Sequence, residues 1–320
     1  MTALAPDATS LGTSAKPVRD VRSGFAFALA SALSFGMSGT LGKGLFDAGW
    51  SPVAAVSARI AIAALALAVP TALSLRGRWH LLLRNAPMVI AYGLIAVLGC
   101  QVAYFQAVSH MQVGLALLIE YTAPIGVVGW LWFRHGERPS RGTVLGGAIV
   151  LAGLVPLLDL FSGGAVSPLG VGWAFLAMTG VAVYFLLSAH DASGLPPLAL
   201  AGSGLIIAAV VIGLADALGI TDVRVSTADV TYGGHAVAWW IPVLLLGLVS
   251  AALAYVTGVE ASRRLGSRLA SFVAIFEVLT ALVVAAILLN QVPTSVQVVG
   301  AVMVLIGVVI VKIGEPTEAP

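Results

Sequence analysis

Long apolar runs alternate with short polar segments along most of the chain. A helix needs about 20 mainly apolar residues to cross the hydrocarbon core of a lipid bilayer. Runs that approach this length cover residues 24–46, 51–75, 86–108, 112–133, 142–158, 168–190, 196–218, 239–260, 268–289 and 294–313. The pattern therefore predicts an all-α, polytopic membrane protein with ten transmembrane helices and two short tails, 1–23 and 314–320.

The composition favours lipid as the main solvent of the chain. Of its 320 residues, 59% are hydrophobic and only 9% are charged, whereas a soluble domain carries roughly 25% charged residues. The single cysteine, Cys100, allows neither an intramolecular disulfide nor a thiolate metal cluster. The net charge of +2 is small, and most basic residues lie in loops beside apolar runs, so nucleic acid is not an expected partner. We also expect no metal and no cofactor.

The basic residues predict the orientation of the helices, because cytoplasmic loops carry an excess of Lys and Arg. With the N-terminus in the cytoplasm, all but three of the 16 basic residues fall on the cytoplasmic side or in its tails. The exceptions are Lys43 and Arg224, on the outer side, and Arg59, inside the second span. We therefore expect a multi-pass protein of the cytoplasmic (inner) membrane with both termini cytoplasmic, as a monomer or a homodimer.

A weak internal repeat links the two halves of the chain. Gapless alignment of PSRGTVLGGAIVLAGLV (139–155) with PTSVQVVGAVMVLIGVV (293–309) superposes a proline and two glycines. The matched pairs are Pro139 with Pro293, Gly146 with Gly300, and Gly153 with Gly307. Glycines seven residues apart are typical of close helix contact. A duplication gives five helices in each half, 24–158 and 168–313, and an odd number inserts the second copy upside down, as is typical of secondary transporters.

Several short motifs, in their order along the chain, resemble the drug/metabolite transporter superfamily of the EamA type. The first half has FGMSGTLGK (35–43), Arg59 in the second span, and Pro124 followed by Glu137 in HGERPS. The second half has AYVTGVEASRRLG and FEVL, where Glu277-Val278 replaces the Glu-Pro pair that is frequent in the family. The resemblance covers 24–313 and implies a tandem five-helix transporter that works by alternating access.

The passage LGCQVAYFQAVSHMQVGLALLIEYTAPIG (98–126) looks more particularly like threonine and homoserine exporters. Those proteins share a Glu-aromatic-Thr-small-Pro sequence in the fourth helix. The likeness implies proton-coupled export of a small amino acid or related metabolite. One family accommodates very different metabolites, so an importer or an uncoupled facilitator is an alternative.

Three ionisable side chains fall deep inside predicted spans, where a charge costs roughly 2.5 to 3.5 kcal/mol at a helix centre. Arg59, Glu120 and Glu277 each follow the start of their span by eight or nine residues. At a rise of ~1.5 Å per residue, this places them roughly 12 to 14 Å deep. The repeat alignment pairs Glu277 with Ala123, about one helical turn from Glu120, so both acids can point toward the axis between the halves.

These charges favour two interpretations. Arg59 could bind the carboxylate of a zwitterionic cargo while an acid binds its ammonium group, and Glu277 or Glu120 could carry a coupling proton. Alternatively, Arg59 and Glu120 form a buried ion pair that only fixes helix packing. A scaffold has no need of such charges at one depth.

Polar residues on other spans supply further substrate-binding candidates. Gln101 and Tyr104 follow helical spacing on the third span and could line a cavity with Tyr121 and Tyr255. For each tyrosine, a hydroxyl that bonds to a neighbouring helix is the alternative. Tyr184 is a second-rank candidate on the sixth span.

Two positions outside this set complete the candidates. Pro124 removes a backbone hydrogen bond just after Glu120 and predicts a kink or hinge in the fourth span. Lys43 matches the basic residue of the family at the end of the first helix and is a second-rank site.

The chain has no motif of an enzyme or of an ATP-driven pump. It contains no Walker-type P-loop, no His-Glu-x-x-His pair and no Gly-x-Ser-x-Gly elbow. We therefore expect no enzyme. The alternative from another class is a membrane-embedded enzyme or scaffold that transports nothing.

Overall fold

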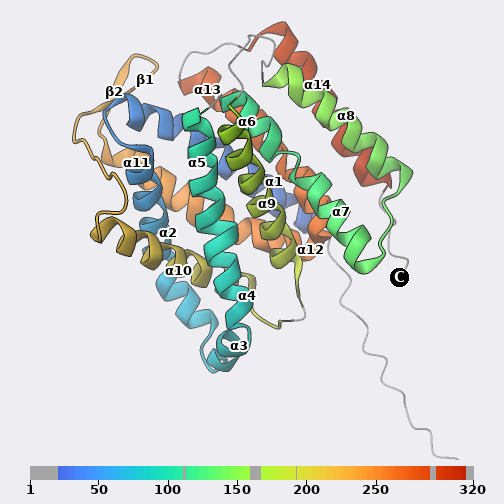
Figure 1. Cartoon of the computed structure of the whole chain (residues 1–320), viewed down its shortest axis with the longest axis horizontal. Coiled ribbons are helices and arrows are strands. Elements are labelled where there is room, and N and C mark those ends of the chain that lie inside the picture. Colours follow the sequence, from blue (N-terminus) through green and yellow to red (C-terminus); the bar gives the residue numbers. More distant parts are fainter. Residues whose placement is uncertain (1–20, 111–112, 159–166, 192, 289–292, 315–320) are drawn as a thin grey trace, which may run out of the picture.

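The computed structural model describes residues 21–110, 113–158, 167–191, 193–288 and 293–314, and these residues form a helical bundle (Figure 1). The predicted tails, 1–23 and 314–320, lie almost entirely outside the described residues. The first half contains α1 (Val21–Asp47), α2 (Pro52–Ser74), α3 (Trp79–Arg84), α4 (Ala86–Ala91), α5 (Cys100–His110), α6 (Val113–Glu120), α7 (Ala123–His135) and α8 (Arg141–Leu157). The second contains α9 (Pro168–Ala189), α10 (Pro197–Ala217), strands β1 (Val230–Tyr232) and β2 (His235–Val237), α11 (Trp240–Gly247), α12 (Ala254–Ala274), α13 (Phe276–Leu288) and α14 (Ser295–Gly314).

Each predicted span has a helical counterpart, and the prediction of a polytopic all-α membrane protein is confirmed. Within the described residues, eight helical stretches are long and apolar enough to cross a membrane, and α8 and α13 are shorter apolar helices. The fourth span, predicted as one helix over 112–133, is instead two helices, α6 and α7, separated by Tyr121 and Thr122. The eighth and ninth spans also differ from the prediction, because α12 continues to Ala274 through a bend at Gly266, whose φ is 80°.

The packing of equivalent helices shows that the two halves are inverted repeats. The helices α8 and α14 lie side by side at one edge of the molecule (Figure 1). A Cβ atom on Gly146 would lie 2.5 Å from the carbonyl oxygen of Gly307, and one on Gly153 would lie 2.9 Å from that of Gly300. The residue order along one helix is thus reversed along the other, so the two equivalent helices run antiparallel. The predicted close contact of these glycines is confirmed.

The first and third spans also pack across the boundary between the two halves. Helix α1 packs against α12, and α9 packs against α5. The first helix of each half therefore lies on the third span of the other half. The halves interlock, and the interior between them is built from both.

We expect Gly146→Val to destabilise the protein, because its side chain would have to displace the α14 backbone. Overpacking of this kind costs about 1 to 3 kcal/mol, so the melting temperature should fall by several degrees. The matched control is Gly213→Ala on α10, where an added Cβ meets nothing within 4 Å and helix propensity improves. Thermal unfolding of the two purified variants would contradict the expected close contact if both melted at the wild-type temperature.

One end of the bundle is held by arginines of α12, and we call it the basic end. Arg268 contacts Glu137, which precedes α8, at 3.3 Å. Arg264 binds Ser23 at the start of α1, and Arg263 lies 3.6 Å from Asp191, which follows α9. These three contacts tie α12 to three separate segments of the chain.

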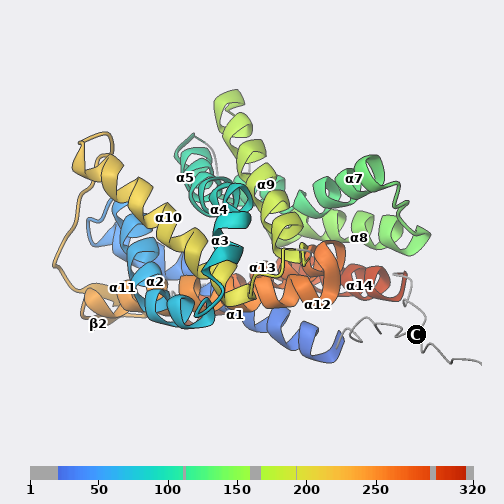
Figure 2. The same cartoon turned by 90° about the horizontal axis from the view of Figure 1, so that it is seen from below.

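The opposite end carries a β-hairpin that the hydropathy pattern did not predict. The hairpin and the α8–α14 pair lie at opposite edges of the molecule (Figures 1 and 2). Strands β1 and β2 pair antiparallel, with Tyr232 opposite His235. Gly233 and Gly234 form the turn with φ of 56° and 84°, which is the backbone that a two-residue hairpin requires and that glycine adopts without strain. We call this end the hairpin end.

The hairpin closes over the outer part of α1. The Tyr232 hydroxyl donates to the Leu41 carbonyl at 2.8 Å. Burial and the nearby Asp47 carboxylate raise the pKa of Tyr232 above its ordinary value, so this donor keeps its proton. The loop before the hairpin is fixed as well, since Trp50 donates to the Ser226 carbonyl at 2.7 Å.

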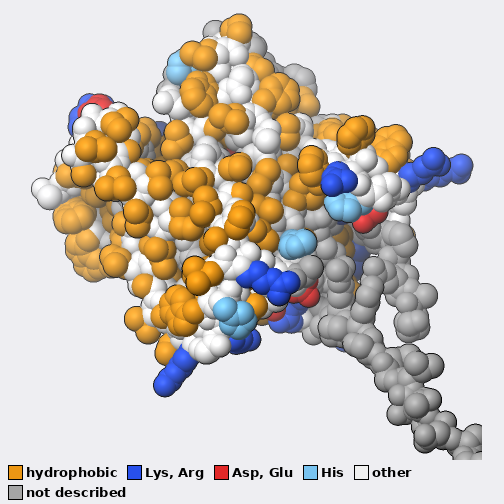
Figure 3. All heavy atoms as spheres, turned by 60° about the horizontal axis from the view of Figure 1, so that its bottom comes forward, with side chains coloured by type: hydrophobic (Ala, Val, Ile, Leu, Met, Phe, Trp, Pro, Cys, Tyr) orange, Lys and Arg blue, Asp and Glu red, His pale blue; other side chains and the backbone are white. Residues whose placement is uncertain are grey.

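The outer surface of the bundle is apolar. Hydrophobic side chains cover most of the face that Figure 3 shows, and Leu65 and Phe133 are 76% and 93% exposed. An apolar surface of this extent cannot face water stably. Together with the long apolar helices, it identifies the chain as a multi-pass membrane protein.

Candidate functional site

Arg59 lies in the interior of the bundle, on α2, with only 7% of its surface exposed. Its Nη1 donates to Oε1 of Gln101 at 2.9 Å, and its Nη2 donates to the Ser250 carbonyl at 2.5 Å. The guanidinium also lies 5.8 Å from the centre of the Phe35 ring. Its Nε is buried without a hydrogen-bond partner among the described residues. One donor of this cation is therefore left for another acceptor.

The hydrogen bond between Gln101 and Tyr255 marks the axis that relates the halves. Nε2 of Gln101 donates to the Tyr255 hydroxyl at 3.2 Å, and the two residues are 154 positions apart. This is also the offset of the glycine pairs, so Gln101 and Tyr255 occupy equivalent positions. Two equivalent residues can touch only near the pseudo-twofold axis. Arg59, bonded to Gln101, is therefore close to this axis.

Both halves interrupt their fourth span beside an acid. Glu120 ends α6, and the helix resumes after Tyr121 and Thr122 with Pro124 in the first turn of α7. Glu277 lies in the first turn of α13, after α12 ends at Ala274. The interruption at 121–122 and the one at 275 are again about 154 residues apart. Discontinuous helices at equivalent positions are characteristic of transporter binding sites.

The two acids have different neighbours. Glu277 interacts electrostatically with Arg59 and lies close to the Tyr121 hydroxyl. Glu120 accepts a weak hydrogen bond from the Cys100 thiol, with sulfur and oxygen 3.8 Å apart, and it interacts electrostatically with Glu277. No ion pair joins Arg59 to Glu120 in the part of the chain that the structure describes. The structure thus does not form the buried Arg59–Glu120 pair, and Glu277 is the acid that interacts electrostatically with the guanidinium.

Two π-helical segments support the site from equivalent positions. One covers Tyr92–Gly99, directly before α5, and the other covers Leu248–Leu253, directly before α12. Widened turns of this kind occur often at functional sites. Here the second segment contains Ser250, whose carbonyl accepts from Arg59. Neither segment leaves a mark in the hydropathy pattern, so the role of Ser250 could not be found from the sequence.

The remaining predicted residues divide into those near the site and one far from it. Tyr104, on α5, interacts electrostatically with both acids. Tyr184 is buried on α9, with its ring centre 5.7 Å from that of Tyr255. Lys43 is 54% exposed near the end of α1, where it pairs with Asp47 at 3.4 Å, so the structure does not bring it to the site.

Two contacts of the site were missed in the sequence. A lone cysteine in an apolar run indicates neither a disulfide nor a metal cluster, yet the Cys100 sulfur lies 3.8 Å from a carboxylate oxygen of Glu120. Phe35, inside the FGMSGTLGK motif, packs edge-on against Tyr255 with ring centres 5.0 Å apart. Its position inside a motif was a signal that could have been used.

The side chains of the site are suited to the recognition of charged groups. Among the described residues, no three His, Cys, Asp or Glu side chains come together as metal ligands. A guanidinium with a free donor can accept a carboxylate, and carboxylates can accept an ammonium group. The arrangement is thus suited to a small molecule that carries both charges.

Comparison with known proteins agrees with the fold. No curated protein matches the chain. A solved structure titled "Crystal structure of protein" is similar, with a TM-score of 0.73 and 19% identity over 93% of this chain and 99% of that chain. At this identity the likeness shows the fold alone. The model of the EamA-like transporter family matches residues 22–158 and 168–313, one match in each half, which confirms the resemblance seen in the motifs: the chain belongs to the EamA-like transporter family of the drug/metabolite transporter superfamily.

Proposed function

We propose that this transporter exports a small zwitterionic metabolite of the amino-acid type by alternating access. The observation that carries the proposal is the position of Arg59, buried beside the pseudo-twofold axis with Nε still free and Glu277 nearby. A cargo carboxylate would bind the guanidinium, and its ammonium group would bind a carboxylate at one of the two helix interruptions. Tyr121, which interacts with both acids, would adjoin the same cargo.

We further propose that Glu120 carries a coupling proton. The site contains one cation and two carboxyl groups, so it is electrically neutral when one carboxyl is protonated, and an unbalanced charge is costly in an apolar interior. Glu277 has Arg59 as a neighbour, whereas the polar neighbours of Glu120 are Cys100 and the other acid. We therefore favour Glu120 over Glu277 as the proton carrier.

The proposed orientation places the basic end in the cytoplasm of a cell whose inner membrane holds the protein. Arg263, Arg264 and Arg268 lie at this end, which supports the orientation because cytoplasmic loops carry an excess of basic residues. Export then means loading at the basic end and release at the hairpin end. Pro124, in the first turn of α7, is the proposed hinge.

Flux measurements in proteoliposomes test the proposal. A panel of radiolabelled amino acids and their singly charged analogues would be offered with and without an imposed pH gradient. We expect zwitterions to be moved, analogues that lack either charge to be moved at least tenfold more slowly, and the gradient to increase the flux. Flux without a response to the gradient would indicate a facilitator, accumulation from the hairpin end an importer, and absence of all flux a protein that does not transport.

A further inference from the structure

A second group of buried hydrogen-bond donors lies between the central site and the basic end. It consists of the hydroxyls of Tyr92, Tyr184 and Ser188 and the guanidinium of Arg263. Tyr184 contacts the ring of Tyr255, which belongs to the central site. Arg263 belongs to the contacts of the basic end. The group therefore occupies the path from one region to the other.

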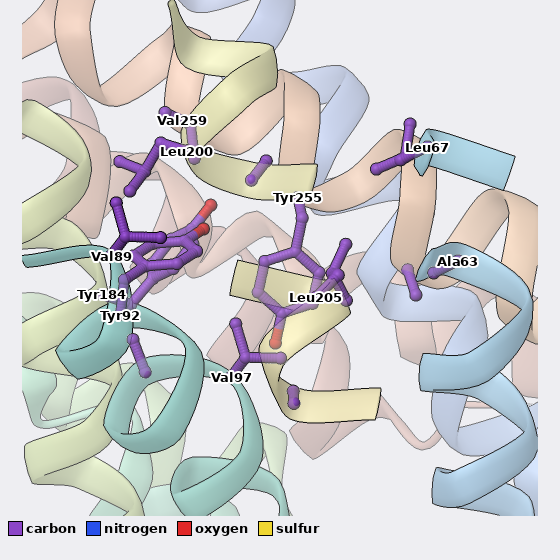
Figure 4. Packing of buried hydrophobic residues seen from close by; sticks show 14 of the residues in the cluster. Ala63, Leu67, Val89, Tyr92, Val97, Tyr184, Leu200, Leu205, Tyr255 and Val259 are labelled. Carbon is purple, nitrogen blue, oxygen red and sulfur yellow. The ribbon is translucent and has the colours of Figure 1, made fainter. Parts of the chain in front are cut away.

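These side chains converge from three elements. The rings of Tyr92 and Tyr184 lie 5.9 Å apart, and Figure 4 shows their hydroxyl oxygens at the same end of the pair, near Val259. Ser188 follows Tyr184 by one helical turn on α9 and interacts with both tyrosine hydroxyls. Arg263, one turn after Val259 on α12, interacts electrostatically with Tyr92.

Most donors of this group lack a well-formed hydrogen bond. Within the described residues none of the three hydroxyls makes one of normal geometry, although Ser188 interacts with both tyrosine hydroxyls. Nε and Nη2 of Arg263 also lack a partner there, whereas Nη1 donates to the Leu195 carbonyl. Tyr92 and Ser188 are fully buried, and Tyr184 is only 7% exposed. An unsatisfied buried polar group costs about 1 to 3 kcal/mol. Several such groups in one place would be stabilised by an additional acceptor.

The chemistry of the group selects the charge of that acceptor. A guanidinium only donates, and the hydroxyls can each donate one hydrogen bond. A carboxylate has two oxygens that can accept several such bonds, and it is attracted by the cation. An ammonium group would be repelled by Arg263 and could not accept any bond. The site thus fits an anion of carboxylate size.

We propose that Tyr92, Tyr184, Ser188 and Arg263 form a loading subsite for the carboxylate of the cargo. The inference rests on the proposed function and adds a second binding site on the route of the cargo to Arg59. Arg263 also donates to the Leu195 carbonyl and lies close to Asp191, so the subsite adjoins the basic end. The cargo carboxylate then passes from one guanidinium to the other along Tyr184 and Tyr255.

Acetate binding tests the subsite without any need for transport. The full chain in nanodiscs would be titrated with acetate, and with the neutral isostere acetamide, and contact would be followed by saturation-transfer NMR of the methyl protons. The background variant is Arg59→Lys, which weakens the central site. We expect this variant to keep an acetate signal that acetamide does not give. Adding Tyr184→Phe and Ser188→Ala should reduce that signal at least threefold.

A matched control is Thr179→Val, which removes an exposed hydroxyl from the same helix and should leave the signal unchanged. Loss of the acetate signal in Arg59→Lys alone would overturn the subsite, as would a signal that survives both hydroxyl substitutions. Each variant must elute as a single folded species. If the variant that combines Tyr184→Phe with Ser188→Ala does not, the variant with Tyr184→Phe alone takes its place. Flux is measured separately, so a protein that binds acetate here but moves no amino acid would contradict the proposed function and not the subsite.

Discussion

Glu120→Gln is expected to abolish the response of transport to a pH gradient while exchange of cargo across the membrane continues. Glutamine has nearly the shape of a protonated glutamate but cannot release a proton. If Glu120 is the proton carrier, the variant is fixed in the loaded, neutral form. The stimulation by an imposed gradient should fall to about onefold, whereas counterflow with equal pH on both sides should stay within about threefold of wild type.

The structure also distinguishes this variant from its counterpart at the other acid. Glu277→Gln removes the carboxylate that interacts electrostatically with Arg59. A buried cation that loses a favourable electrostatic partner is less stable, so this variant should melt at a lower temperature than Glu120→Gln. The opposite pattern, with gradient response lost only in Glu277→Gln, would place the proton on Glu277.

Arg59→Lys should reduce transport at least tenfold although it keeps the positive charge. The guanidinium bonds to Gln101 and to the Ser250 carbonyl through separate nitrogens, and it has a third nitrogen left for cargo. A lysine ammonium is a point charge that cannot reproduce this planar fork. Loss of one hydrogen bond to a charged group costs about 1.5 to 3 kcal/mol, which corresponds to roughly 10-fold to 100-fold in cargo affinity.

The control for this variant is Arg84→Lys, an exposed arginine of α3, which should transport as wild type does. Initial rates over a range of cargo concentrations are the measurement, and we expect mainly a higher KM. Folded Arg59→Lys protein with wild-type KM would show that Arg59 serves packing and not cargo. A variant with no folded protein would require Gln101→Leu as the second test, since it removes one acceptor of Arg59 while it retains the cation.

Much of the fold could be predicted because apolar length and spacing determine it directly. A helix in lipid must satisfy its own backbone groups, so each long apolar run became a helix. The repeated glycines were recognisable as sites of close helix contact, because only a missing side chain permits such close backbones, but the contact of Gly146 with Gly307 comes from the structure. The β-hairpin was missed although Val230–Tyr232, Gly233-Gly234 and His235–Val237 have the spacing of a two-residue turn between strands. Each strand has only 3 residues, which is too short to stand out in a hydropathy pattern.

The residues of the candidate site could be predicted from the sequence, but the contacts between them could not. Arg59, Glu120 and Glu277 were identifiable because charges inside spans are costly. Which acid lies beside Arg59 depends on how α2, α6 and α13 rotate against one another, and the sequence pattern does not specify this rotation. The interruption between α12 and α13 could also not be predicted from the sequence, because Val278 occupies the position where a proline would have indicated it.

The hydrogen bond between Gln101 and Tyr255 has a consequence for the energies of the two access states. In a protein with identical halves, exchange of their conformations would give inward-open and outward-open forms of equal free energy. Here one equivalent position holds an amide and the other a phenol, and the bond has a fixed donor and acceptor. Exchange therefore cannot reproduce the same contact, and we expect the two forms to differ in population at rest. Because apparent affinity scales with the population of the binding-competent form, we expect the empty transporter to present unequal affinities to the two sides of the membrane.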